Sequence, residues 1–191
     1  MKRACAMALV LAACGAPLPQ ESYYALSSPQ LPTIAAPASP LGLYVGPVTV
    51  PDTVDRANMV LRISPNQVEI SDAYRWAEPL KTAIARVLAE TLSRELGTTR
   101  VFASRAGATG PVDYRIAVEV QRFESSLETG ATIVAIWTIV PTAKDTPIRT
   151  GRTVAEEPLP TRDPQGLAAA HGRVLDRIGR DIAAALRSNT P

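Results

Sequence analysis

The side chains with the most reactive chemistry in this sequence are Cys5, Cys14 and a single histidine, His171. Hydrolases and transferases need a nucleophile beside a base, a metal ion or a matched pair of carboxylates. The two cysteines lie within the first fourteen residues, far along the chain from His171. The sequence also has no Gly-x-Ser-x-Gly, no phosphate-binding glycine loop and no cluster of histidines and cysteines. We therefore predict that the protein is not an enzyme and that it uses no metal or other cofactor.

Cys14 follows a segment with the features of a secretory signal. Lys2 and Arg3 precede an apolar run from Ala4 to Ala13. A short cationic region, an apolar run of about 7–15 residues and small residues at the cleavage site mark such a signal. The run is too short to span a bilayer, which takes about 20 apolar residues. Its end, Leu11-Ala12-Ala13-Cys14, resembles the lipobox of bacterial lipoproteins.

This resemblance implies that the signal peptide, Met1–Ala13, is removed and that Cys14 is diacylated on sulfur and acylated on its new amino group. Stable anchoring takes more than one acyl chain, since each buried CH₂ contributes only about 0.8 kcal/mol. Gly15 stands where enteric lipoproteins that stay in the inner membrane carry aspartate, so we expect the outer membrane, with the domain facing the periplasm. The alternative is a conventional signal cut near Ala16 or Ala25, which leaves Cys14 incidental.

The totals for the mature chain exclude several classes of protein. Removing Met1–Ala13 from the 191 residues leaves 178, which suits one domain with a sizeable core. Removing Lys2 and Arg3 from the 20 basic residues leaves 18, against 18 acidic residues. A nucleic-acid-binding protein would show a strong basic excess, so we predict no nucleic-acid partner. With Cys5 cleaved away and Cys14 acylated, the domain has no disulfide and no cysteine metal site.

The patterning predicts an α+β fold, a mostly antiparallel sheet with two amphipathic helices packed on one face. Residues 14–41 are a proline-rich lipidated tether, because six prolines favour extended backbone. Within it, residues 23–26 suit a short strand that docks on the domain edge. A single domain then occupies residues 42–191. Its strands are expected at 43–50, 59–63, 67–70, 100–103, 112–120, 131–140 and 148–156, the last three as a meander.

Two helices complete the predicted domain. The first begins at Pro79 and carries apolar residues at intervals of three to four until Gly97 ends it. The second has Asp163 as its N-cap and Pro164 as its first residue. His171 lies on the apolar stripe of this second helix. We therefore interpret it as a core or helix-packing histidine.

The predicted strand 131–140 is apolar on both faces. If the helices cover only one face, the other needs a partner, because large exposed apolar patches rarely go unused. We expect Ile133, Trp137 and Ile139 to contact a partner protein or a lipid, with the helices on the opposite side. The alternative is a strand buried on both faces. The opposite side carries Val134, Ile136 and Val140.

Three stretches carry a resemblance to a known family: the turn at residues 50–56 that ends in Asp55-Arg56, then Arg62, then residues 75–80, Arg-Trp-Ala-Glu-Pro-Leu. Together, from Tyr24 to the last helix, the chain resembles the ABC-type transport auxiliary lipoproteins, the group that contains paraquat-inducible protein C. The resemblance implies a lipoprotein that accompanies a mammalian-cell-entry-type lipid transport system. Its partners would be a mammalian-cell-entry-domain protein, which it docks, and the ABC transporter permease and ATPase complex.

Other functions stay open at this stage. The protein could be a lipoprotein that itself carries a phospholipid, or a structural envelope lipoprotein, and self-association into a homo-oligomer is also open. Arg56, Arg62 and Arg75 would suit lipid phosphates. Mixed charges of this kind more often form surface pairs, here with Asp55, Glu69 or Glu78. Trp76 is expected to anchor the first helix against the sheet.

Overall fold

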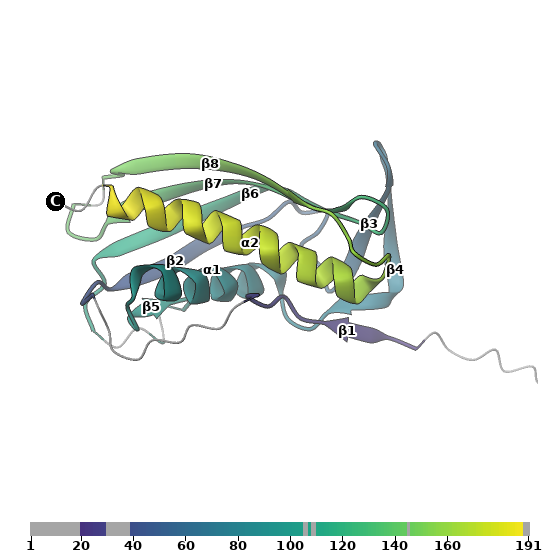
Figure 1. The fold of residues 1–191 in the computed structure, drawn as a ribbon, viewed down its shortest axis with the longest axis horizontal. Coiled ribbons are helices and arrows are strands. Elements are labelled where there is room, and N and C mark those ends of the chain that lie inside the picture. Colours follow the sequence, from purple (N-terminus) through teal and green to yellow (C-terminus); the bar gives the residue numbers. More distant parts are fainter. Residues whose placement is uncertain (1–19, 30–38, 105–106, 108–109, 145, 189–191) are drawn as a thin grey trace, which may run out of the picture.

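The computed structural model describes residues 20–29, 39–104, 107, 110–144 and 146–188. The signal segment, Cys14 and most of the predicted tether lie outside these residues. An eight-stranded sheet and two helices make up the fold (Figure 1). The elements are β1 (Ser22–Tyr24), β2 (Leu43–Thr49), β3 (Asn58–Ser64), β4 (Gln67–Trp76), α1 (Leu80–Leu96), β5 (Val101–Phe102), β6 (Tyr114–Ser126), β7 (Gly130–Pro141), β8 (Arg149–Glu157) and α2 (Pro164–Arg187).

Strand β6 is the centre of the sheet. One of its edges pairs with β7 from Tyr114 to Ser126, and β7 pairs in turn with β8, so the predicted meander is present. Two strands, one beyond the other, pair with the opposite edge of β6. β2 pairs with the first half of β6, and β3 reaches β6 at Leu61, opposite Ser125. The sheet therefore continues through β3 into the hairpin formed with β4 and on to β1.

The predicted α+β class is confirmed, but the sheet is more parallel than expected. Antiparallel pairing joins β3 to β4, β6 to β7 and β7 to β8. The pairings β1–β4, β2–β5, β2–β6 and β3–β6 are parallel. Parallel neighbours need crossover connections, which run far along the chain. Local turn patterns do not reveal them, and only the three antiparallel pairings were visible in the sequence.

The helix boundaries follow their capping residues. Pro79 precedes α1 as its cap rather than as its first residue, and Gly97 ends the helix with φ 63°, a left-handed conformation that glycine adopts without strain. Asp163 caps α2 as predicted: its Oδ1 accepts a 2.7 Å hydrogen bond from the backbone N–H of Gly166. Neither helix of the described chain is long and apolar enough to cross a membrane.

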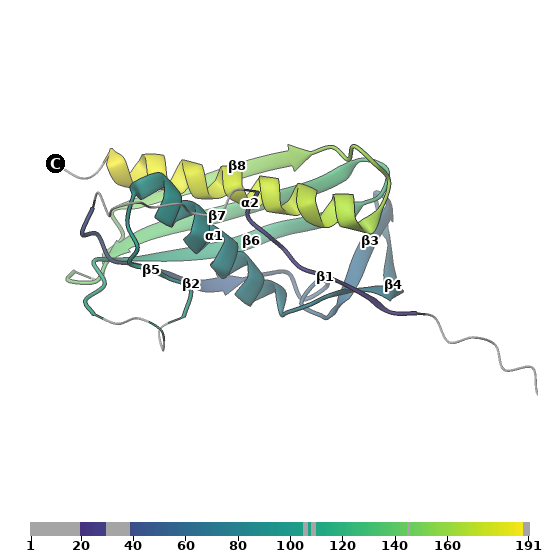
Figure 2. The ribbon, with the colours of Figure 1, turned by 60° about the horizontal axis from the view of Figure 1, so that its bottom comes forward.

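Both helices cover the same face of the sheet, as predicted (Figures 1 and 2). Their buried sides, with the facing strand residues, form one continuous core. Ile133, Trp137 and Ile139 belong to this core, with Trp137 6% exposed and the other two fully buried. The expectation that these three residues form an exposed contact face is therefore wrong. The helices pack on the side of β7 that carries these three residues. They do not cover the opposite side, although Val134 and Val140 on that side are also buried.

The packing of Trp137 explains why this side of β7 takes the helices. Its indole lies over Gly151, the register partner on β8, where any Cβ would overlap the ring. The indole Nε1–H donates to Thr153 Oγ1 at 3.2 Å, and that hydroxyl donates to Asp181 on α2 at 2.8 Å. A buried tryptophan normally finds such a partner. The absence of a side chain at Gly151 thus creates the space that Trp137 fills.

The N-terminal segment is held firmly on the domain. β1 pairs with the end of β4, close to the short strand predicted at residues 23–26. Leu26 is buried in the core, and Arg86 of α1 donates to its carbonyl oxygen at 2.8 Å. Gly172 of α2 faces the backbone of Ser27 so closely that an added Cβ would overlap the carbonyl oxygen. This glycine permits the close approach of segment and helix.

Replacing Gly172 with alanine should therefore loosen the N-terminal segment. We expect Gly172→Ala to lower the free energy of unfolding by about 1–3 kcal/mol, the usual cost of overpacking, despite the higher helix propensity of alanine. Chemical denaturation of the domain would measure this. The matched control is Gly166→Ala, whose new Cβ would have its nearest neighbour at 3.1 Å. If Gly172→Ala were as stable as the control, the contact with Ser27 would not constrain the fold.

Candidate functional site

Two of the sequence stretches that carry the family resemblance meet at the start of α1. They line a surface cavity of about 370 Å³, which we call the motif pocket. One wall comes from the turn before β3 and the other from the end of β4 and the first residue of α1. The lining residues are Asp55, Arg56, Ala57, Trp76, Ala77, Glu78, Pro79 and Leu80.

Backbone hydrogen bonds hold the two walls of the motif pocket together. The N–H of Trp76 donates to the carbonyl oxygen of Ala57 at 2.7 Å. The N–H of Ala77 donates to the carbonyl oxygen of Tyr24 in β1 at 2.9 Å. The N-terminal segment therefore contributes to the site, although Tyr24 does not line the pocket. The shape of the pocket is a property of the sheet rather than of a loose loop.

The charged groups around the motif pocket are largely paired. Lys81 binds Asp55 at 2.6 Å, and Arg86 binds Glu78 at 2.5 Å. The hydrogen bond that Arg86 donates to Glu78, together with the one to Glu90, raises the pKa of Arg86 despite its partial burial. Arg56 is exposed, and no ion pair joins it to another residue in the described parts of the chain. The rim thus has mixed charge, with one free cation.

The predicted partners of the three arginines were wrong, although the prediction that arginines form ion pairs holds for two of them. Arg62 binds Glu124 of β6 at 2.7 Å, and Arg75 binds Glu21, just before β1, also at 2.7 Å. Both partners depend on strand pairings that no local pattern shows. Lys81 and Arg86 were also missed as parts of the site. The one sequence feature that could have pointed to them is their position off the apolar stripe of α1.

Comparison with known proteins identifies the family. The family model described as ABC-type transport auxiliary lipoprotein component matches residues 24–183. The chain belongs to this family. Its members are lipoprotein components of ABC-type transport systems, so membership supports both a role in such a system and attachment to a membrane. No curated protein matches the chain.

Two solved structures share the fold of this transport auxiliary lipoprotein. Protein XCC0632 from Xanthomonas campestris superposes with a TM-score of 0.70 at 19% sequence identity, covering 88% of this chain and 99% of that chain. A second structure, described as an uncharacterized protein, gives a TM-score of 0.70 at 20% identity and covers 87% and 99%. At such identities the similarity concerns the fold alone.

Trp76 forms the floor of the motif pocket and anchors it to the core of the auxiliary protein. The side chain is buried, and its ring packs edge-on against Phe123 and His171, with centroids 6.0 and 5.9 Å apart. Edge-to-face packing of this kind stabilises aromatic groups beyond simple burial. Trp76 is therefore a buried packing residue, but these ring contacts join it to β6 and α2, whereas the sequence predicted an anchor for α1.

His171 is a core histidine, as predicted. Its ring stacks on Phe123 with centroids 4.1 Å apart, and its Nε2 lies 2.8 Å from Ser125 Oγ. Complete burial lowers the pKa of His171 from 6.5 to about 3, because the charged imidazolium would lose its hydration. The imidazole is therefore neutral at any ordinary pH.

The pairing of Ser125 with His171 resembles a nucleophile and its base but lacks the rest of a catalytic site. Both side chains are buried, at 2% and 0% exposure, so substrate has no access. Within the described chain, His171 Nδ1 has no hydrogen-bond partner, whereas a catalytic histidine is oriented by a carboxylate at this atom. No group of three or more potential metal ligands occurs among the described residues either.

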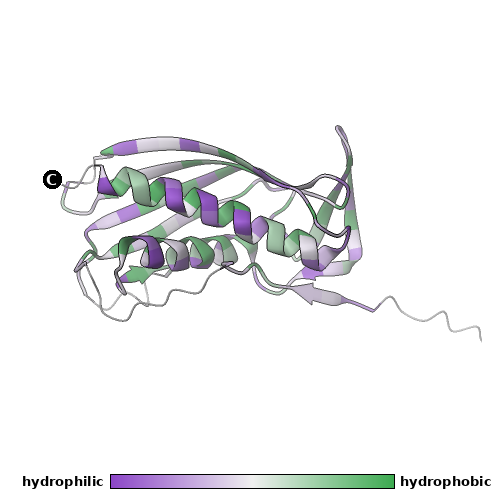
Figure 3. Cartoon of the chain, viewed as in Figure 1, coloured by the Kyte–Doolittle hydropathy of each residue, from purple (hydrophilic) through white to green (hydrophobic). Residues whose placement is uncertain are grey.

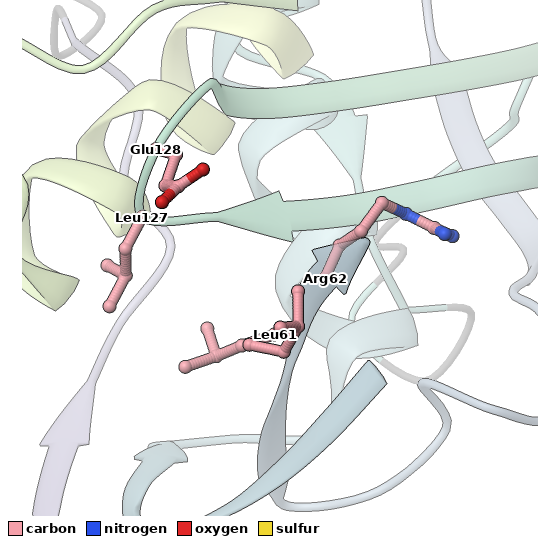
Figure 4. A pocket seen from close by; sticks show the side chains of 5 residues that line it. Leu61, Arg62, Leu127 and Glu128 are labelled. Atoms are coloured by element: carbon pink, nitrogen blue, oxygen red, sulfur yellow. The ribbon is translucent and has the colours of Figure 1, made fainter. Parts of the chain in front are cut away.

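Two further cavities lie near the motif pocket. One, of about 380 Å³, runs between β1 and the start of α2. The other, of about 210 Å³, lies between β3 and the turn that joins β6 to β7. Figure 4 shows Leu61 and Leu127 reaching into this second cavity while Arg62 points away from it. Sites that enclose small ligands usually measure about 300–1,000 Å³, so the three cavities lie at or below the lower end of that range.

The buried imidazole predicts a specific pH dependence of stability. Below pH 6.5 the unfolded chain binds a proton at His171. The folded protein does not bind this proton until the pH falls to about 3. Stability is therefore full above pH 6.5, and this residue should remove about 1.4 kcal/mol of unfolding free energy for each pH unit below it. Denaturation curves between pH 7 and pH 4 would show this slope.

The matched variants for this measurement are His171→Gln and Ser125→Ala. His171→Gln removes the titrating group, so its stability should fall less steeply with decreasing pH than that of the natural protein. Ser125→Ala removes only the hydrogen-bond partner and should keep the steep slope. Equal slopes for the natural protein and His171→Gln would mean that the folded protein accepts the proton.

Proposed function

We propose that this protein is a non-enzymatic lipoprotein that faces the periplasm and docks the mammalian-cell-entry-type protein of an ABC lipid transport system at the outer membrane. One observation carries the proposal: family-like residues distant in the sequence converge on an exposed concave surface, the motif pocket. Residues needed only for folding would be expected in the core. Instead Arg56 and Ala77, on opposite walls, are exposed.

The chemistry of the motif pocket suits a protein partner better than a lipid. Its rim combines paired charges with the exposed cation of Arg56, and its floor is the buried indole of Trp76. Protein interfaces typically join an apolar centre to a polar rim. The other two arginines considered for lipid phosphates, Arg62 and Arg75, already bind carboxylates.

The alternative function, a lipoprotein that itself carries a phospholipid, was suggested by a feature that the fold does not have. It rested on a strand that is apolar on both faces and would therefore offer one of them to a lipid. In the fold, the Trp137 side of β7 is filled by the two helices. On the other side, Val134 and Val140 are buried among neighbouring side chains, and Ile136 is half-buried. Neither side of β7 offers an enclosed space for an acyl chain.

The membrane anchor in this proposal is Cys14. A lipidated cysteine would hold the domain at the membrane surface, within reach of a partner that spans the periplasm. The described chain begins at Gln20, only six residues after Cys14, and is fixed to the sheet from Ser22 onward. A short connection of this kind keeps the motif pocket near the membrane.

The anchor can be tested by substituting the two cysteines separately. We expect Cys14→Ala to abolish the acyl chains and the cleavage before residue 14, because no thiol remains there to modify. Cys5→Ala is the control: the residue lies in the predicted signal, so the mature protein should be unchanged. Mass spectrometry of the N-terminal peptide from isolated membranes measures both. An unmodified Cys14 in the natural protein would refute this part of the proposal.

The docking surface can be tested by photo-crosslinking in living cells. A photoreactive residue in place of Arg56 should yield an adduct with a mammalian-cell-entry-type protein, because this side chain stands on the rim of the motif pocket. The control position is Arg152, which is exposed on β8. It should give no such adduct. If Arg152 captured the same protein as well as Arg56, or if neither did, the motif pocket would not be the docking surface.

A further inference from the structure

The hairpin of β3 and β4 exposes an unusual amount of apolar surface. Ile63, Val68 and Ile70 are 52%, 48% and 47% exposed. They are three of the six large apolar residues found exposed in the described chain, and they lie within eight positions of one another. Isolated exposed apolar residues are normal, but a cluster marks an interaction surface. Figure 3 shows hydrophobic stretches on the hairpin where it rises clear of the helices.

The exposure follows from how the hairpin joins the sheet. β3 pairs with β6 only at Leu61. Beyond that residue, toward the turn at Pro65 and Asn66, no other strand of the described chain pairs with the hairpin. The register pairs Val60 with Ile70 and Arg62 with Val68, so these four side chains point to the same face. Glu69 points to the other face, and Ile63 lies at a register irregularity between Arg62 and Ser64, so the exposed aliphatic pair on this face is Val68 and Ile70.

The described N-terminal segment joins the domain at the end that carries this hairpin. β1 runs parallel to β4, with Ser22 opposite Tyr74 and Tyr24 opposite Trp76. The N-terminal segment thus runs alongside the end of β4, and extra residues of β4 between the partners of Asn58 and Val60 separate this end from the hairpin tip. The ion pair between Glu21 and Arg75 fixes this approach. Figures 1 and 2 show β1 and the hairpin at the same end of the long axis.

The tether is also short. Eight residue steps separate Cys14 from Ser22, so even a fully extended tether spans at most about 26–29 Å. A short tether raises the effective concentration of a second contact to the order of millimolar, so a weak contact suffices. The same end of the domain thus carries the anchored segment and the exposed aliphatic pair.

We infer that the tip of the β3–β4 hairpin lies against the lipid surface that holds the anchored N-terminus, with Val68 and Ile70 in its interfacial layer. The inference rests on the acylation of Cys14 proposed above. The contact is apolar rather than electrostatic, because the nearby guanidinium of Arg62 already binds Glu124. It would orient the domain on the membrane, which a single flexible anchor does not do.

Tryptophan reporters test the contact directly. The lipoprotein is purified with its anchor and placed in phosphatidylcholine vesicles with or without bromine on the acyl chains, which quenches indoles that reach them. Val68→Trp is compared with Val154→Trp on β8, a site of nearly equal exposure at 47%. The natural Trp76 and Trp137 are buried and give the same background in both variants. Ile70→Trp provides a second reporter should Val68→Trp fold poorly.

We expect the fluorescence added by Val68→Trp to be blue-shifted and largely lost in brominated vesicles, and that of Val154→Trp to be unaffected. Equal quenching of the two variants, or none, would overturn the inference and leave the hairpin free for a protein partner. The mass of the purified protein reports acylation separately. If Cys14 proved unacylated, the mature chain joined through this single thiol to a maleimide phospholipid would repeat the measurement, so failure of the anchor and failure of the contact remain distinguishable.

Discussion

The stack of His171 on Phe123, with Trp76 edge-on to both rings, joins the two halves of this protein. Trp76 ends β4 and immediately precedes α1, Phe123 lies on β6, and His171 lies on α2. The cluster therefore connects the hairpin and the motif pocket to the meander and the long C-terminal helix. Because the cluster is fully packed, the imidazole must stay neutral, and Ser125 supplies its hydrogen bond. The position of the motif pocket on the sheet depends on this contact.

Much of the secondary structure could be predicted because local patterns determine it. Asp163 with Pro164 starts α2, Gly97 ends α1, and alternation of apolar residues marks β6. The order of the strands could not be predicted in the same way. β2 and β3 share one edge of β6 although Leu61 and its partner Ser125 are 64 positions apart in the sequence. Such a pairing leaves no trace in local spacing.

Strand β7 shows most clearly where sequence reasoning fails. A strand that is apolar on both faces predicts burial, but it does not say which face the helices cover. In the fold, Trp137 lies on the covered face, where the missing side chain of Gly151 on β8 makes room for it. A glycine within a strand is a weak signal by itself. Its meaning emerges only when the register places it opposite a tryptophan.

The sequence singled out the stretches that line the candidate site, but the contact surface was predicted elsewhere, at Ile133, Trp137 and Ile139. The stretches around Arg56 and Trp76 do meet, yet the charges there are bound by Lys81 and Arg86, and the outer strand of the sheet at this end is β1. One hydrogen bond, from Ala77 to Tyr24, links the wall of the motif pocket to the segment that leads to the proposed anchor. Because that segment is a strand of the sheet, the orientation of the pocket relative to the tether is set by the fold. Under the proposed function, the docking surface and the strand that leads to the membrane attachment are therefore parts of one rigid unit.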